Sequence, residues 1–222
     1  TPANTNGWNN GDVTVTFTCT DAGSGIATCP DPVTLTAEGT GQHTTGTATD
    51  AAGNTASVTV DAVNIDKTAP EVTFAGDRTY TIDETVTVTC TATDSLSGLA
   101  AEPCAAPLVS APAYRLGPGT HAVSVTATDN AGNTTSAATN YTLSVTYTSL
   151  VTLINSLVPN KGLATAFEAA LRAAEAADAR GNTPAQNAAL DAFIHQVQAQ
   201  SGKALTAEQA NLLAAWATAL KQ

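Results

Sequence analysis

The stretch VTVTFTCTDAGSGIATC (Val13–Cys29) decides the fold class, because it returns later in the chain as VTVTCTATDSLSGLAAEPC (Val86–Cys104). Both copies run from alternating Thr and Val to a Cys and an Asp, then through a Ser-Gly loop to a second Cys. This alternation of apolar and Thr side chains is typical of strands with one buried and one solvated face. Turn residues interrupt the strands at short intervals, so the repeat predicts two related antiparallel β-sandwiches.

A second match in each copy marks a hairpin turn. TATDAAGNT (Thr47–Thr55) corresponds to TATDNAGNT (Thr126–Thr134), and an alternating strand follows each of them. Asp can cap such a turn with its side chain, Gly accepts a positive φ, and Asn tolerates the conformation that follows. In this first interpretation, turn chemistry alone explains why the sequence is repeated.

Composition and charge exclude several classes of partner. The 222 residues contain 19 acidic and 8 basic residues, for a net charge of −11. Nucleic acids and anionic membranes attract clustered Lys and Arg, so neither is expected as a partner. No apolar run approaches the roughly 18 residues of a membrane span, so no membrane insertion is expected. Near Tyr147–Ser149 a composition rich in Thr and Val gives way to one rich in Ala and Leu, which indicates a domain boundary.

The four cysteines form two local pairs, one in each copy of the repeat. The sequence has no Cys-x-x-Cys spacing and no His close to a Cys, so a zinc site is disfavoured. Disulfides are the preferred interpretation, and they imply an oxidising, extracellular setting. The expected pairs are Cys19–Cys29 and Cys90–Cys104.

The segments GWNNGDVTVTFTCTDAGSGIATC, GTATDAAGNTASVTV and NIDKTAP resemble the tandem Ig-like repeats of secreted and surface proteins of bacteria, particularly of actinobacterial type. The resemblance covers about residues 1–147 and implies two tandem Ig-like sandwiches, at 1–69 and 70–147. The second copy lacks the GWNN opening and has GDRTYTIDE in its place. Repeats of this kind serve mostly as spacers or binding modules around other domains.

The second interpretation of the repeated turn is a calcium site. In an Ig-like sandwich the loop after the first Cys strand and the late hairpin lie at the same pole, and the linker enters the second sandwich there. Asp66 of the linker would then lie near Asp94, Asp129 and Asn133, whose oxygens suit Ca²⁺. Asp21, Asp50 and Asn54 are the weaker candidates in the first copy, which has no such linker. Neither turn matches the EF-hand pattern, so the site would be built from several loops.

The last third of the chain shows helical periodicity. Leu150, Leu153, Ile154 and Leu157 share one helical face, and three more amphipathic segments follow. Thr183 with Gln186 and Thr206 with Gln209 have capping-box spacing. Four helices with short connections predict a small antiparallel bundle over 148–222. The segment LDAFIHQVQAQSGKALTAEQANLL resembles the FIMAH-type domain of secreted bacterial proteins, which implies an accessory module of a larger protein.

No catalytic constellation is found, so the chain is not expected to be an enzyme. His43, His121 and His195 fall in different elements, without a nucleophile motif or a phosphate loop. His195 is expected to flank a helix and Trp216 to lie in the core. The expected role is that of an accessory C-terminal region of a secreted or cell-surface protein, acting as a rigid spacer attached to an N-terminal domain of the same precursor. The alternative is an adhesin-like module that binds polysaccharide, cell wall or a surface protein.

Overall fold

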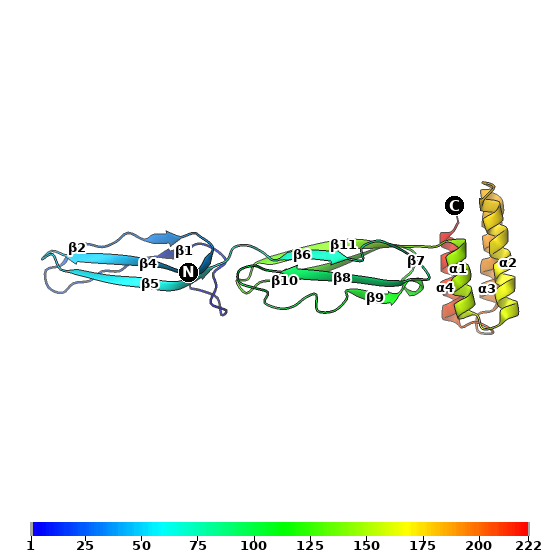
Figure 1. Ribbon diagram of the computed structural model, residues 1–222, viewed down its shortest axis with the longest axis horizontal. Coiled ribbons are helices and arrows are strands. Elements are labelled where there is room, and N and C mark those ends of the chain that lie inside the picture. The colour runs from blue at the N-terminus through cyan, green and yellow to red at the C-terminus, as the bar shows by residue number, and fades with distance from the viewer. Residues whose placement is uncertain (1, 222) are drawn as a thin grey trace. The chain divides into compact units, whose positions relative to one another are not determined.

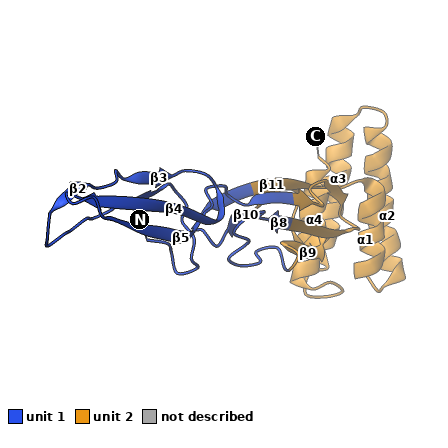
Figure 2. Cartoon of the chain, turned by 60° about the vertical axis from the view of Figure 1, so that its left-hand side comes forward, with its two compact units in different colours: residues 1–73, 91–105, 125–137 blue, residues 74–90, 106–124, 138–222 orange. Residues whose placement is uncertain are grey.

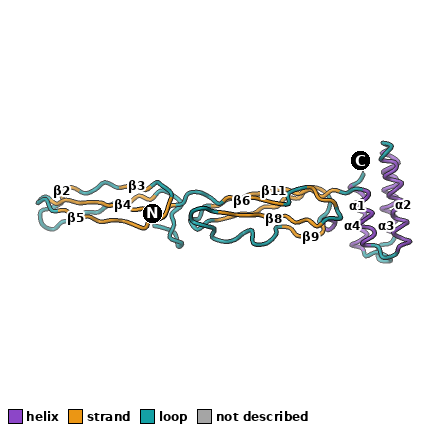
Figure 3. Tube along the Cα trace, viewed as in Figure 1, coloured by secondary structure: helices purple, strands orange, loops and turns teal. Residues whose placement is uncertain are grey.

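All the strands of the protein precede its α-helices. A computed structural model describes residues 2–221, in which eleven strands lie between Val13 and Ser144 and four α-helices lie between Tyr147 and Ala219 (Figures 1 and 3). This confirms a mixed β and α protein with several antiparallel strand pairings.

The first copy of the repeat contains five strands in two small sheets. Strand β1 pairs with β3, and β4 lies between β2 and β5 in a three-stranded sheet. The long hairpin of β4 and β5 turns between Asp50 and Thr55, where TATDAAGNT predicts it. The strands are β1 (Val13–Val15), β2 (Ile26–Thr28), β3 (Val33–Leu35), β4 (Gly39–Asp50) and β5 (Thr55–Ile65).

The second copy contains six strands in two three-stranded sheets, ordered β6-β8-β9 and β10-β11-β7. Strands β8 and β9 are antiparallel, whereas β7 runs parallel to β11. A short 3₁₀ helix, η1 (Ala113–Arg115), follows β9. The strands are β6 (Glu71–Ala75), β7 (Thr79–Thr81), β8 (Thr85–Thr93), β9 (Val109–Pro112), β10 (Gly119–Thr128) and β11 (Thr134–Ser144).

Side-chain caps define the beginnings of the four helices. Thr206 accepts from the backbone N–H of Gln209, and the Gln209 side chain bonds back to Thr206, which is the expected capping box. The cap predicted at Thr183 is wrong, because Asn182 takes that role and accepts from the N–H of Ala185. The helices are α1 (Tyr147–Leu157), α2 (Lys161–Asp178), α3 (Thr183–Ala199) and α4 (Ala207–Ala219).

The chain divides into two compact units whose limits differ from those of the sequence repeats (Figure 2). Unit 1 comprises residues 1–73, 91–105 and 125–137, and therefore contains the first copy together with one end of the second. Unit 2 comprises residues 74–90, 106–124 and 138–222. Its core joins side chains of β7, β8 and β11 to those of all four helices, with Tyr80, Leu143, Phe167, Phe193 and Trp216 among the buried members. The division at 69/70 and 147/148 stays a prediction.

The cysteines are oxidised, as expected. A disulfide joins Cys19 to Cys29, Cys90 and Cys104 are also disulfide-bonded, and the described residues include no free cysteine. Within residues 2–221, none of the helices has the length and apolar character needed to cross a membrane.

Candidate metal centre

Three carboxylates from three separate segments meet within unit 1. Asp66 follows β5, Asp94 follows β8 and Asp129 follows β10. Their nearest ligand oxygens all lie within 4.8 Å of one another. Asp66 and Asp129 are buried, with 0% and 1% of their surface exposed, and Asp94 is half-buried. The structure therefore brings together the linker Asp and the two loop Asp residues that the sequence singled out.

Asp94 is held by the loop that follows it. Its Oδ1 accepts hydrogen bonds from the backbone N–H groups of Leu96 at 3.1 Å and Gly98 at 2.6 Å. The loop thus folds around one carboxylate oxygen and fixes the direction of the side chain. Both donors are neutral backbone amides, so neither brings a positive charge to Asp94.

Asp129 is held by the hairpin turn between β10 and β11. Its Oδ1 accepts from the N–H groups of Gly132 at 2.7 Å and Asn133 at 2.8 Å, and its Oδ2 accepts from Nδ2 of Asn133 at 2.8 Å. Gly132 has a φ of +98°, a conformation that glycine adopts without steric cost. The turn motif therefore orients the Asp as the first interpretation requires.

The linker carboxylate is tied to the same loops. Asp66 accepts from the N–H of Thr68 at 3.1 Å and from the N–H of Ser97 at 3.0 Å. The Nδ2 of Asn133 donates to the backbone carbonyl of Asp66 at 2.9 Å and to that of Thr68 at 3.3 Å. Asn133 therefore holds the linker through its amide nitrogen and positions the carboxylates around it.

No basic side chain among residues 2–221 forms an ion pair with these three carboxylates. Lys67, the next residue after Asp66, instead binds Asp12 at 2.9 Å and the carbonyl of Thr36 at 2.7 Å. Buried charges are costly unless they are paired or bind a metal. Three hard oxygen donors from different loops, with two of them buried and without a positive partner, are the kind of set that binds Ca²⁺.

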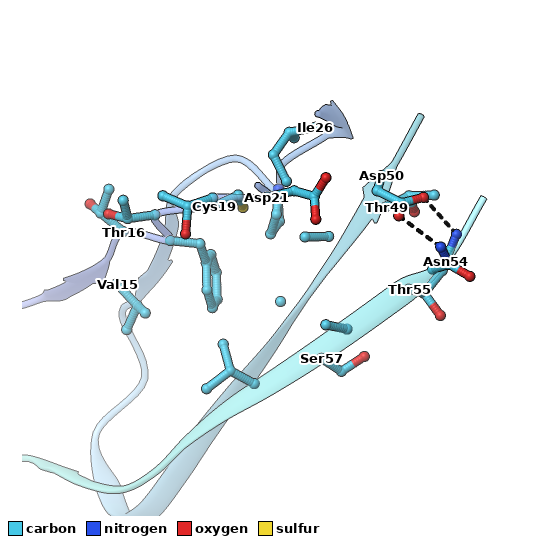
Figure 4. Close-up of a pocket in the computed structure, with 18 of the residues that line it drawn as sticks. Val15, Thr16, Cys19, Asp21, Ile26, Thr49, Asp50, Asn54, Thr55 and Ser57 are labelled. Carbon is cyan, nitrogen blue, oxygen red and sulfur yellow. Dashed lines mark hydrogen bonds between the residues drawn. The ribbon is translucent and has the colours of Figure 1, made fainter. Parts of the chain in front are cut away.

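The weaker candidates of the first copy have the same turns but not the same cluster. Asp21 accepts from the N–H groups of Gly23 at 3.1 Å and Gly25 at 2.8 Å, just as Asp94 accepts from its own loop. Asp50 accepts from the N–H and Nδ2 of Asn54, both at 2.8 Å (Figure 4). The hydrogen bond from Nδ2 of Asn54 is the largest of the causes that lower the pKa of the Asp50 carboxyl. Within the described residues, no third carboxylate joins Asp21 and Asp50, so turn chemistry is sufficient here.

Sequence reasoning missed Asn130. Its Nδ2 donates to the carbonyl of Ser97 at 2.8 Å, and its own carbonyl accepts from Nδ2 of Asn4 at 2.8 Å and of Asn6 at 3.1 Å. Asn130 thus connects the turn of the second copy to the Asp94 loop and to the N-terminal segment. The available signal was the one changed residue inside the turn, where DAAGN in the first copy becomes DNAGN in the second.

No protein-family profile matches the chain, and no curated protein matches it either. Among solved structures, it is similar over 48% of its length to the protocadherin GammaB4 extracellular domain, with 18% identity and a TM-score of 0.30. A second similarity, also over 48% of this chain, is to the PcdhgB3 EC1-4 structure, with 21% identity and a TM-score of 0.27. The matched regions cover 21% and 32% of those two chains. We infer neither ligand nor function from similarity at this level.

Proposed function

We propose that the chain is a non-catalytic accessory region of a larger secreted or cell-surface protein. In this proposal two tandem Ig-like sandwiches form a spacer that presents a FIMAH-like helical bundle, and Ca²⁺ fixes the linker between the sandwiches. The observation that carries the proposal is the meeting of buried Asp66 with Asp94 and Asp129 within 4.8 Å. A linker residue and two loops of the second copy would then be joined by one ion.

The ion would be held by the three carboxylates. Asp94 uses only its Oδ1 in the hydrogen bonds described above, and each accepting carboxylate oxygen has a further lone pair. Asn133, Ser97 and the loop amides would keep these oxygens in place before the ion arrives. Such a site would lower the freedom of the linker, because Asp66 could leave only by breaking its bond to the ion.

The surroundings of the histidines favour a non-catalytic role. His43 and His195 are exposed on separate elements. His121 stacks on Tyr141, with ring centroids 5.2 Å apart, and its Nε2 lies 3.0 Å from the carbonyl of Gly117. None of these contacts places a His beside a nucleophile.

The alternative is a carbohydrate-binding or surface-binding module, and the aromatic residues favour it less. Sugar sites usually present open aromatic faces on which a sugar ring can stack. Tyr80 and Tyr141 are buried, and Trp8, Tyr114 and Tyr147 are half-buried. A glycan array probed with and without Ca²⁺ tests this alternative, and saturable glycan binding would favour it over the spacer.

Calcium titration of the chain tests the metal proposal. Extracellular calcium modules bind with Kd values of about 10⁻⁴–10⁻³ M, so the melting temperature should rise as Ca²⁺ is raised to about 10 mM and fall again in EGTA. At 100 times the Kd, binding stabilises the folded state by about 2.7 kcal/mol. The shift should be larger with Ca²⁺ than with Mg²⁺, because irregular loops suit the flexible coordination of Ca²⁺.

Two matched variants locate the effect. Asp94→Asn keeps a side-chain oxygen for the loop amides but removes the charge, and it should abolish the calcium-dependent shift. Asp21→Asn makes the same change in the corresponding loop of the first copy and should leave the shift intact. A melting temperature that ignores Ca²⁺, or equal effects of the two variants, would contradict the site.

A further inference from the structure

The late hairpin turn binds the loop between the two cysteines in the same way in both copies of the repeat. In the first copy the backbone N–H of Ala51 donates to the carbonyl of Gly25 at 2.9 Å. In the second copy the backbone N–H of Asn130 donates to the carbonyl of Gly98 at 2.8 Å. Ala51 and Asn130 therefore occupy equivalent backbone positions, and the difference between the two turns lies in the side chain.

The side chain of Asn130 adds a contact that an Ala at this position cannot make. Its Nδ2 donates to the carbonyl of Ser97 at 2.8 Å, and the N–H of Ser97 in turn donates to Oδ2 of Asp66 at 3.0 Å. Among residues 2–221, Asn130 forms no hydrogen bond with the three carboxylates of the metal centre. It therefore acts on the buried linker carboxylate through Ser97.

The N-terminal segment (Asn4–Asn9) binds the other side of Asn130. The carbonyl of Asn130 accepts from Nδ2 of Asn4 at 2.8 Å and from Nδ2 of Asn6 at 3.1 Å. The Oδ1 of Asn4 also accepts from the backbone N–H groups of Asn6 and Trp8, both at 3.0 Å. One side chain thus folds the segment into a turn and fastens it to the second copy.

The same segment also binds the linker. The backbone N–H of Asn9 donates to the carbonyl of Asn64 at 3.0 Å, and the carbonyl of Asn9 accepts from the N–H of Asp66 at 2.9 Å. These bonds form a parallel bridge between Asn9 and Ile65, and Asn9 is only 9% exposed. The backbone that carries the Asp66 carboxylate is therefore held by the N-terminal segment.

Together these contacts form a closed ring of hydrogen bonds at the linker. The ring leads from Asp66 to Ser97, Asn130 and the N-terminal segment, and back to Asp66. It joins four segments of the chain, two of which carry a carboxylate of the metal centre. A site whose ligands are already held in place binds more tightly, because less ordering accompanies binding.

We propose, on the basis of the calcium function proposed above, that Asn130 and the N-terminal segment are positioning elements of the metal centre. They would not touch the ion and would act by holding Asp66 and Ser97. Coupling between two binding events is reciprocal, so Ca²⁺ should in return strengthen the attachment of the N-terminal segment. The first copy would then respond to the ion as far as Asn4, although it contributes one of the three carboxylates.

The difference between the two copies in sequence agrees with this role. The GWNN opening (Gly7–Asn10) belongs to the copy whose last strand leads into the linker with Asp66. The second copy has GDRTYTIDE in its place, and its last strand leads into α1. The segment thus occurs in the copy that has a carboxylate of the metal centre to hold.

Calorimetric titration of the intact chain with Ca²⁺ tests Asn130. Asn130→Ala gives the second turn the DAAGN sequence of the first, so the turn should still form. The Kd for Ca²⁺ should rise about five-fold, the effect of losing one hydrogen bond that holds the site. Ala51→Asn makes the reverse change in the first copy, away from the three carboxylates, and should leave the Kd within about two-fold.

The N-terminal segment is tested by a second matched pair of variants. Asn4→Ala removes the donor to the carbonyl of Asn130 and the acceptor for two backbone N–H groups at an exposed position, and should raise the Kd about three-fold or more. Asn10→Ala makes the same change at an exposed residue whose side chain has no hydrogen bond within the described residues, and should leave the Kd unchanged.

Trp8 gives a readout that a purely structural role would not change. The chain has two Trp residues, and Trp216 is fully buried in unit 2, so acrylamide quenching reports mainly on half-buried Trp8. Quenching should fall as Ca²⁺ is added, with the midpoint found by calorimetry. Trp8→Phe should abolish this change while Ca²⁺ still binds.

The possible failures are distinguishable. If both Asn130→Ala and Asn4→Ala bind Ca²⁺ with the Kd of the unmodified chain, the positioning role is wrong and the calcium site stands. If Asn130→Ala is unfolded by circular dichroism, Asn4→Ala decides alone. Quenching of Trp8 that saturating Ca²⁺ leaves unchanged would overturn the coupling. Absence of Ca²⁺ binding to the folded, unmodified chain at about 10 mM, above the range of extracellular calcium modules, would overturn the proposed function and this inference with it.

Discussion

Asp129 and Asp50 occupy equivalent turns in the two copies of the repeat. Each accepts two hydrogen bonds from the Asn four residues later, one from its backbone N–H and one from its Nδ2. They differ in what lies beyond the turn, because Asn133 also binds the carbonyl of buried Asp66 and Asn54 has no such contact among the described residues. The local turn was predictable from the sequence, since Asp, Gly and Asn have intrinsic turn preferences. The role of Asn130 was not, because its partners lie in the Ser97 loop and the N-terminal segment.

Replacing each Asn by Ala measures this difference at the residue scale. Asn133→Ala removes the side-chain donor to the carbonyl of Asp66 and to Oδ2 of Asp129 in a part-buried site, while the backbone donors to Oδ1 of Asp129 stay, and it should cost about 1–3 kcal/mol of unfolding free energy. Asn54→Ala removes an exposed hydrogen bond and should cost less than about 1 kcal/mol. Urea unfolding of the two variants in EGTA gives both values. Equal losses would show that the linker contact of Asn133 adds nothing.

At the scale of elements, the alternating pattern located the strands in both copies but not their extent. A pattern records which side chains can face a core, whereas strand length depends on a neighbour that supplies hydrogen bonds. The aligned strands accordingly differ in length, since β8 extends to Thr93 and β1 ends at Val15. Helix beginnings were harder still where two capping residues adjoin. Asn182 and Thr183 can both cap, and Gln186 instead donates to the hydroxyl of Tyr147 and the carbonyl of Leu220.

Two glycines with similar backbone conformations test whether the close approach of the backbone after β6 to β8 contributes to stability. Gly76 follows β6 at a φ of +84°, and a Cβ there would lie 2.0 Å from the carbonyl oxygen of Thr87 and 2.9 Å from the hydroxyl of Tyr80. Gly53 has a φ of +90°, and nothing lies within 4 Å of the corresponding Cβ. Gly53→Ala should therefore cost about 1–2 kcal/mol for the left-handed backbone alone.

Gly76→Ala should cost more, about 2–5 kcal/mol in total, because overpacking adds to the backbone strain. It should also disturb the hydrogen bonds that the Tyr80 hydroxyl donates to the carbonyls of Gly76 and Thr87. Denaturant unfolding measures both variants. If Gly53→Ala proves as costly as Gly76→Ala, the close approach of β6 to Thr87 is not a source of stability.

At the scale of the whole molecule, composition predicts a boundary near Tyr147, and the compact units divide the chain elsewhere. A change from Thr and Val to Ala and Leu records a change of secondary structure, not the limits of a core. In unit 2 one core contains Tyr80, Ile82 and Leu143 from the second copy together with Leu150, Phe167 and Trp216 from the helices. The sequence could not show that these strands and helices share one core, because the apolar face of an element does not indicate which other face it contacts.

Trp216 tests whether the helices and these strands of unit 2 unfold together. Its side chain is fully buried in α4, and its Nε1 donates to the carbonyl of Tyr114 in η1 at 2.9 Å. Trp216→Ala should cost about 3–5 kcal/mol, the usual range for deleting a buried large aromatic side chain. Hydrogen exchange followed by mass spectrometry should then show faster exchange in α1–α4 and also in β9, η1 and the β7–β11 pair.

Val13→Ala, in the buried start of β1, serves as the control and should speed exchange in unit 1 alone. If Trp216→Ala speeds exchange in the helices alone, the helical segment unfolds independently, and the contact of Trp216 with η1 does not couple the helices to the strands of unit 2.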